Sequence, residues 1–222
     1  MLTLVIGNKN YSSWSLRPWL LLRQSGVEFR EIKLPLDEPE FYARITEYSP
    51  AGRVPVLIHH DQSVGDVHVW DSLAICEYAN EHLLDDRGWP SERAARAHAR
   101  SISAEMHSGF TALRTALPMN TRKRVPTPTL TADVLRDIAR VTALWREARE
   151  RHASHGDFLF GRFSIADAMY APVVLRFLSY AIDLGTVERT YADAILALPV
   201  LQEWLAEAAH EPLAPLHEKN TP

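Results

Sequence analysis

The sequence is short of several features that mark whole classes of proteins. Its 222 residues contain one cysteine, Cys76, which excludes a disulfide framework within the chain and any zinc site built from cysteines. The first ten residues, MLTLVIGNKN, have no basic segment and only a short apolar stretch. We therefore expect no signal peptide and no membrane segment there, and a cytoplasmic protein as the default.

Clustered positive charge is also missing. The net charge is −4, and the one basic cluster is TRKR at 121–124, so we do not expect nucleic acid as a partner. The sequence has neither a G-x-S-x-G elbow nor a glycine-rich phosphate loop. His59 and His60 are adjacent in a predicted strand and would face opposite sides, so we expect no metal cofactor.

The first third of the chain alternates between the periodicities of strands and helices. Apolar or period-two runs predict strands at 2–6, 27–34, 53–60 and 64–70, and helical spacing predicts helices at 16–26, 38–50 and 71–83. The order βαβαββα predicts a compact α/β domain over residues 1–83, with right-handed crossovers in its parallel part.

The remainder of the chain has a different pattern. Residues 84–92, LDDRGWPSE, are polar and contain glycine and proline, which predicts a linker. Beyond them we predict an all-helical domain over residues 93–222. Its expected helices cover 93–117, 131–152, 164–182 and 199–210.

Two short motifs each have a structural and a functional interpretation. In GRVPVL, Pro55 is either an edge-strand proline or half of a cis Val54–Pro55 bond, which would leave the backbone of Val54 open to a peptide-like ligand. In WDSLAI, Asp71 or Ser72 would cap the next helix. The same geometry would bind a ligand carboxylate at Ser72 and an ammonium group at Asp71.

The stretch NKNYSSWSLRPWLLL sets three serines ahead of a helix. We expect Ser15 to be the N-cap of that helix, because serine is a preferred capping residue. Ser12 would then lie ahead of the helix and be free to point at a ligand, with Ser13 as its rival.

Two further features are expected to be structural. Ser164 and Asp167 in FSIADAM form an S-x-x-D capping box at the start of a buried helix. Cys76 lies in an apolar helical segment and is interpreted as a buried thiol, not a nucleophile.

Taken in order, YSSWSLR, GRVPVL, WDSLAICEYANEHL and FSIADAM resemble the cytosolic glutathione S-transferase superfamily, and most closely its serine-type classes such as zeta and tau. The resemblance covers nearly the whole chain. It implies a thioredoxin-like N-terminal domain that binds glutathione as a co-substrate. It also implies a helical C-terminal domain that supplies most of the electrophile pocket, and a homodimer.

The resemblance also assigns site residues. The sulfur contact falls to Ser12, with Ser13 and Tyr11 as alternatives. The residues implied for glutathione binding are Arg53 (glycyl carboxylate), Val54 and Pro55 (cysteinyl unit), and Asp71 and Ser72 (γ-glutamyl unit). The residues expected to form the electrophile pocket are Trp14, Met106, His107, Phe110 and Arg114. Residues 106, 110 and 114 share one helical face, and such a stripe is also typical of a core.

The implied activity is conjugation of the glutathione thiolate to small, largely apolar electrophiles. Lowering a thiol pKa by about two units from ~8.5 requires roughly 2.7 kcal/mol, which a serine hydroxyl and a helix N-terminus supply together. One alternative is a maleylacetoacetate- or maleylpyruvate-type isomerase, with Arg17 and Arg114 binding substrate carboxylates. Trp14 counts against it, because the zeta pattern has cysteine there. A non-catalytic binding protein with the same fold is the other alternative.

Overall fold

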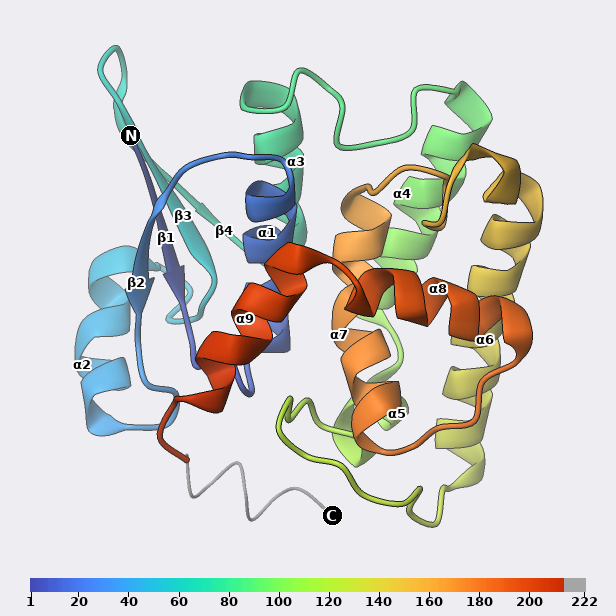
Figure 1. Cartoon of the computed structure of the whole chain (residues 1–222). Helices are drawn as coiled ribbons and strands as arrows, with labels where there is room; N and C mark the ends of the chain where they lie inside the picture. Colours follow the sequence, from blue (N-terminus) through green and yellow to red (C-terminus); the bar gives the residue numbers. More distant parts are fainter. Residues whose placement is uncertain (214–222) are drawn as a thin grey trace.

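The computed structural model describes residues 1–213 and begins with a four-stranded mixed sheet (Figure 1). The strands are β1 (Leu2–Ile6), β2 (Arg30–Lys33), β3 (Val56–Asp61) and β4 (Gly65–Trp70). They lie in the order β2-β1-β3-β4, with β1 parallel to β2 and the other pairs antiparallel. With helices α1 (Ser13–Gln24), α2 (Pro39–Tyr48) and α3 (Ser72–His82), they confirm the predicted βαβαββα order.

Both faces of this sheet are covered by helices, which explains why β1 is buried along its whole length. Successive side chains of a strand point to opposite faces. Leu4 and Ile6 join the apolar cluster that contains α1 and α3. Val5 joins Val56 and Phe41 in a second cluster beneath α2. The sheet therefore holds the start of α1 and the start of α3 on the same side.

The second part of the described chain is helical (Figure 1). Its elements are α4 (Arg93–Ser108), α5 (Thr111–Ala116), α6 (Ala132–His152), the 3-10 turn η1 (Ala153–His155), α7 (Ile165–Ser179), α8 (Thr186–Leu196) and α9 (Pro199–Ala209). Within residues 1–213, no helix is long and apolar enough to cross a membrane. Residues 214–222 of the predicted second domain lie outside the described residues.

The prediction of one continuous helix over 93–117 is wrong, because the chain breaks at Gly109 and Phe110. The Gly109 amide still donates to the Glu105 carbonyl, at 2.9 Å, but Phe110 has a left-handed φ of 56°. A Cβ at Gly109 would lie 2.7 Å from the Glu105 carbonyl oxygen. The break gives α5 its own direction, so residues 106, 110 and 114 do not follow a single helical spacing.

One apolar core joins the sheet half to the helical half. It contains Trp19 of α1, Ile75 of α3, Met106 of α4 and Trp204 of α9, all nearly inaccessible to solvent. Helix α7 runs through this core and is buried on almost every side. An apolar sequence without a polar face is the pattern of such a central helix.

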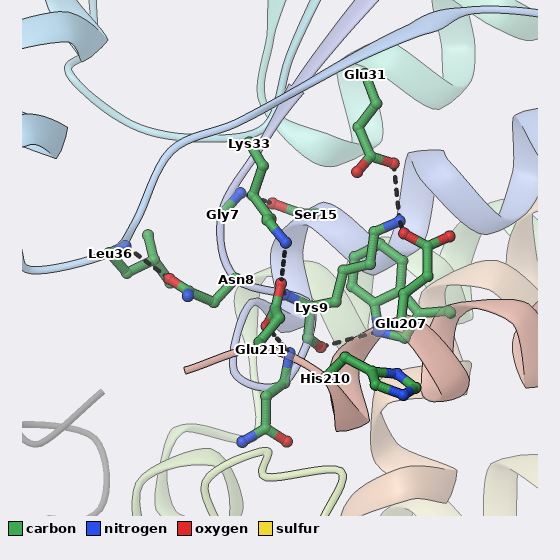
Figure 2. A network of polar contacts seen from close by, with 12 residues as sticks. Gly7, Asn8, Lys9, Ser15, Glu31, Lys33, Leu36, Glu207, His210 and Glu211 are labelled. Atoms are coloured by element: carbon green, nitrogen blue, oxygen red, sulfur yellow. Dashed lines mark hydrogen bonds and ion pairs between the residues drawn. The ribbon is translucent and has the colours of Figure 1, made fainter. Parts of the chain in front are cut away.

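The C-terminal segment also holds the loop that leads into α1. Figure 2 shows the Glu211 carboxylate, just after α9, beside that loop. Its oxygens accept the backbone amides of Lys9 at 2.9 Å and Asn10 at 3.0 Å. Because Glu211 is almost completely buried, these bonds fix the loop over residues 7–12 from the opposite end of the chain.

The Lys9 side chain forms a buried ionic centre in the same region (Figure 2). Its Nζ lies 2.9 Å from the Glu31 carboxylate and 2.7 Å from that of Glu207. The rings of Trp19 and Trp204 flank the ammonium group at 4.8 Å and 5.3 Å. The two carboxylates and two aromatic faces compensate the desolvation of this charge.

Candidate active site

A cavity of about 520 Å³ lies where the sheet half meets the helical half. Its lining residues are Trp14, Ala51, Arg53, Val54, Pro55, Trp70, Asp71, Ser72, His107 and Arg114. All five residues expected to bind glutathione are in this set, together with three of the five expected for the electrophile pocket. Met106 and Phe110 lie instead in the apolar core.

Two lining residues, Ala51 and Trp70, were missed by the sequence analysis. Trp70 is the last residue of β4 and is 45% exposed, which is unusual for a tryptophan at the end of a strand. It directly precedes Asp71 in the WDSLAI motif, so its position in the sequence was a usable signal. Ala51 carries no chemical group that sequence reasoning could single out.

The GRVPVL motif forms one wall of the cavity. The Val54–Pro55 bond is cis, as the functional interpretation required. Arg53, Val54 and Pro55 all line the cavity. The Arg53 amide donates to the Ser49 hydroxyl at 3.4 Å, which ties the motif to the end of α2.

The start of α3 forms another wall of the cavity, and the capping interpretation of WDSLAI is confirmed there. Asp71 is the N-cap, and its Oδ1 accepts the amides of Leu73 at 2.9 Å and Ala74 at 3.2 Å. Its φ of 75° is left-handed, a conformation that aspartate tolerates better than most residues. Ser72 is buried and begins the helix. The same two residues thus cap α3 and line the cavity.

The other Asp71 oxygen is bound from the helical half. Oδ2 lies 3.0 Å from Nε2 of His107, a residue in the last turn of α4. The His107 ring packs edge-on against Trp14, with ring centroids 5.3 Å apart. Burial, assisted by Arg17 and Arg114, lowers the pKa of His107, while Asp71 acts in the opposite direction.

Two arginines pack against the ring of Trp14. The guanidinium carbons of Arg17 and Arg114 are 4.2 Å and 4.6 Å from its ring centroid. Arg17 is fully buried, and burial, together with Arg114 and Arg176, lowers the pKa of its guanidinium to about 9.

Arg17 has little compensation for its charge. Its Nη1 donates to the Ser72 hydroxyl at 3.4 Å, and its Nε has no partner. Within residues 1–213, no carboxylate forms an ion pair with Arg17. Arg17 is outside the set of lining residues but contacts two of them, Trp14 and Ser72, so it places a positive charge directly behind the wall of the cavity.

The prediction that Ser15 caps α1 is wrong, because Ser12 is the N-cap. The helix begins at residue 13, earlier than expected, so the Ser15 amide donates to the Ser12 Oγ at 3.4 Å. The Ser12 hydroxyl in turn donates to the Ser15 Oγ at 2.7 Å. Ser15 also accepts the Gly7 amide at 3.1 Å and is completely buried.

Ser13 has a different environment. Its Oγ accepts a hydrogen bond from Nη2 of Arg176 at 3.1 Å. Arg176 reaches it from α7, so a residue of the helical half orients a hydroxyl at the start of α1. Tyr11, Ser12 and Ser13 are all buried and lie outside the set of lining residues, next to Trp14, which is in it.

The two features expected to be structural are confirmed. Cys76 is buried, and burial raises the pKa of its thiol well above the ordinary value. Asp167 accepts the Ser164 amide at 2.8 Å and the Ser164 hydroxyl at 2.9 Å, at the start of α7. It also accepts the Leu159 amide at 3.0 Å, which joins the preceding loop to the helix.

Comparison with known proteins agrees with this architecture. Two family models match, described as the glutathione S-transferase N-terminal domain over residues 11–82 and the glutathione S-transferase C-terminal domain over residues 94–207. A protein described as "Probable maleylacetoacetate isomerase" from Caenorhabditis elegans is 33% identical over 98 residues. That match covers 44% of this chain and 42% of the relative, so less than half of the relative's length is spanned.

Similar solved structures share the fold over almost the whole chain. A glutathione transferase homologue from Burkholderia GL BGR1 with bound glutathione has a TM-score of 0.70 at 21% identity, covering 95% of this chain and 99% of that one. A maleylacetoacetate isomerase from Anaeromyxobacter dehalogenans 2CP-1 with bound GSH has a TM-score of 0.67 at 23% identity, covering 97% and 98%. Ure2p in complex with glutathione has a TM-score of 0.70 at 17% identity, covering 92% and 93%.

Proposed function

The chain belongs to the glutathione S-transferase family, and from this premise we propose that it is a glutathione-dependent enzyme acting on small electrophiles. One observation carries the proposal. The residues that the resemblance assigns to glutathione, Arg53 to Pro55 and Asp71 to Ser72, converge on one cavity although they come from separate elements. Solved relatives of the same fold hold glutathione.

Each of these groups matches a part of the tripeptide. The backbone of Val54 pairs with the cysteinyl unit, as with an extended peptide. The γ-glutamyl carboxylate binds the Ser72 hydroxyl at the start of α3, and its ammonium group binds Asp71. Arg53 is available to the glycyl carboxylate.

The chemical step would be attack by the glutathione thiolate on the electrophile, both held in the cavity. Ser12 was favoured for the sulfur contact, but its hydroxyl already bonds both the hydroxyl and the backbone amide of Ser15. Ser13 accepts from the Arg176 guanidinium, so its own proton remains available to the sulfur. We therefore assign the sulfur contact to Ser13, with Ser12 as the helix cap.

A second candidate, glutathione-dependent isomerisation of a maleyl-type dicarboxylate, is favoured by the arginines. Arg17 and Arg114 bring positive charge to Trp14, and within residues 1–213 Arg17 has no carboxylate partner. A substrate carboxylate would bind Arg114, which lines the cavity, with the charge of Arg17 behind the wall adding to the attraction. The partial match to an isomerase of this type points the same way.

Assays with a neutral substrate and with a negatively charged substrate distinguish the two activities. Purified protein is given glutathione with either a neutral aryl halide or a maleyl-type dicarboxylate, and product is followed by chromatography. Transferase function predicts conjugation of the halide. Isomerase function predicts a cis-to-trans change of the dicarboxylate without net consumption of glutathione.

A variant of Arg114 tests whether this residue binds a carboxylate of the substrate. Arg114→Met should lower kcat/KM for the dicarboxylate about tenfold or more and change that for the neutral halide much less, because one charge-assisted contact is lost. Arg100→Met is the matched control, since Arg100 is half-exposed and paired with Glu77 away from the cavity. Failure to turn over any substrate while glutathione binds would favour the non-catalytic alternative.

The resemblance also leads us to propose a homodimer. Sedimentation equilibrium at several protein concentrations tests this. A mass near 25 kDa at every concentration would overturn it.

A further inference from the structure

The contact between His107 and Asp71 joins the two halves of the protein at the point where a γ-glutamyl ammonium group would bind. Asp71 follows β4, and His107 belongs to the last turn of α4. Their atoms Oδ2 and Nε2 are 3.0 Å apart. The other Asp71 oxygen is already occupied by two amides of α3. Oδ2 is therefore the oxygen that His107 and a ligand ammonium group would have to share.

The charges around His107 decide which form of the imidazole the site accommodates. Asp71 faces it from the start of α3, Arg17 from α1 and Arg114 from α5, and Trp14 packs against its ring. Burial and the two arginines lower the pKa of His107, which outweighs the effect of Asp71. At neutral pH the imidazole is therefore uncharged. It donates its Nε2–H to Asp71 and leaves the carboxylate negative.

We propose that His107 is a positioning residue for the amino group of glutathione. In its neutral form it orients the Asp71 carboxylate by one hydrogen bond and leaves its negative charge available to the ammonium group. When protonated it becomes the counter-ion of Asp71 and competes with the ligand. This inference rests on the proposed function, because it requires that Asp71 binds the γ-glutamyl unit.

The consequence is a dependence of glutathione binding on pH that originates in the helical half of the protein. Because burial lowers the pKa of His107, affinity stays full through the usual histidine range and falls below it, as His107 becomes protonated. Between pH 8 and pH 5 we expect a loss of about 3- to 10-fold, the size of a like-charge interaction at about 4 Å in a water-like dielectric. The ligand's own amino group loses its proton only at the alkaline end of this range, and it does so equally with wild type and variants, so the effect cancels in their comparison.

The test uses S-methylglutathione, whose sulfur does not titrate, with the full chain and calorimetry from pH 8 to pH 5. His107→Gln keeps an N–H donor for Asp71 and cannot become charged. We expect it to bind like the wild type at pH 8 and to lose the additional fall at low pH. His107→Ala should also lack that fall and should bind several-fold more weakly at pH 8, because Asp71 loses its orienting donor.

Two controls separate this role from a general effect of histidine or of pH. His98 lies on the same helix, is also partly buried, and packs against Phe160 away from the cavity. His98→Gln should keep the wild-type pH profile. An S-methylglutathione analogue that lacks the α-amino group should show no His107-dependent fall.

The inference is overturned if His107→Gln falls with pH as the wild type does, or if the analogue without an amino group shows the same His107-dependent fall. Absence of S-methylglutathione binding by the wild type at every pH would overturn the proposed function as well. The two failures are thus distinguishable.

Discussion

Arg17 is a buried cation whose neighbours compensate its charge only weakly. It stacks on Trp14, forms one long hydrogen bond to Ser72, and faces Arg114 and Arg176. Burying a charge without a partner costs stability, and such groups cluster at functional sites. The unpaired charge of Arg17 therefore lowers the stability of the protein and favours binding of an anion in the cavity.

Arg17→Met tests this directly. Because methionine fills similar space without a charge, we expect the free energy of unfolding to stay the same or to rise by about 1 kcal/mol. Affinity for an anionic ligand of the cavity should fall several-fold, because the charge of Arg17 acts on it from behind Trp14 and Ser72. Arg136→Met, at an exposed position on α6, should change neither quantity. A loss of stability above about 2 kcal/mol in Arg17→Met, by urea unfolding, would show that the charge is structurally compensated.

Among the elements, the break between α4 and α5 separates two residues that line the cavity, His107 and Arg114. It occurs at Gly109 and Phe110, where a Cβ would approach the Glu105 carbonyl closely. His107 lies just before the break and Arg114 just after it. The direction of both side chains toward the cavity therefore depends on this turn. Arg114 also donates to the Gly109 carbonyl at 3.2 Å, which stabilises the break.

Gly109→Ala should lower the free energy of unfolding by about 1–3 kcal/mol, since the new Cβ forces the backbone to move. Glutathione affinity should fall with it, because His107 shifts relative to Asp71. Ser108→Ala is the neighbouring control, an exposed change expected to cost less than about 0.5 kcal/mol. Urea unfolding and calorimetry measure the two effects. Wild-type stability in Gly109→Ala would contradict this role.

The bounds of some helices and strands could be predicted from the sequence, and those of others could not. The strands and helices α2, α3, α6, α7 and α9 were predicted within a few residues, because each has its own periodicity and a clear start or stop signal. The break at Gly109 was not, since the apolar spacing continues across it. Helix α8 was missed. The break depends on the left-handed backbone at Phe110, which the apolar spacing does not reveal. Helix α8 did have a usable signal, because its buried residues Glu188, Tyr191, Ala192 and Ile195 follow helical spacing.

In the candidate site, too, local motifs could be predicted from the sequence, whereas contacts between distant residues could not. Local motifs predicted Val54, Pro55, Asp71 and Ser72, because capping and proline chemistry depend on nearby residues. The roles of the serines depend on a partner from α7, at Arg176, which is distant in sequence. The contact of Asp71 with His107 likewise joins two halves and has no local signature.

At the scale of the whole molecule, a continuous core and a returning C-terminal segment hold the two halves together. Helix α9 packs near α1 (Figure 1), and Glu211 binds the loop before α1 (Figure 2). That loop ends at Ser12, the cap of α1. The stability of the cavity therefore depends on contacts far from it.

Glu211→Ala removes the acceptor of two buried amides and should lower the free energy of unfolding by about 2–4 kcal/mol. Glu203→Ala is the matched control, because Glu203 forms a half-exposed ion pair with Arg23, worth less than about 1 kcal/mol. Urea unfolding at one fixed protein concentration provides the comparison. Equal losses in the two variants would contradict the anchoring role of Glu211.

The central claim is that the protein activates the thiol of bound glutathione. Ultraviolet absorbance of bound glutathione against pH tests it most directly, with wild type, Ser12→Ala and Ser13→Ala. We predict a thiol pKa well below the free value of ~8.5 in the wild type, restored toward that value in Ser13→Ala and kept low in Ser12→Ala. An unshifted wild-type titration with glutathione bound would contradict the account.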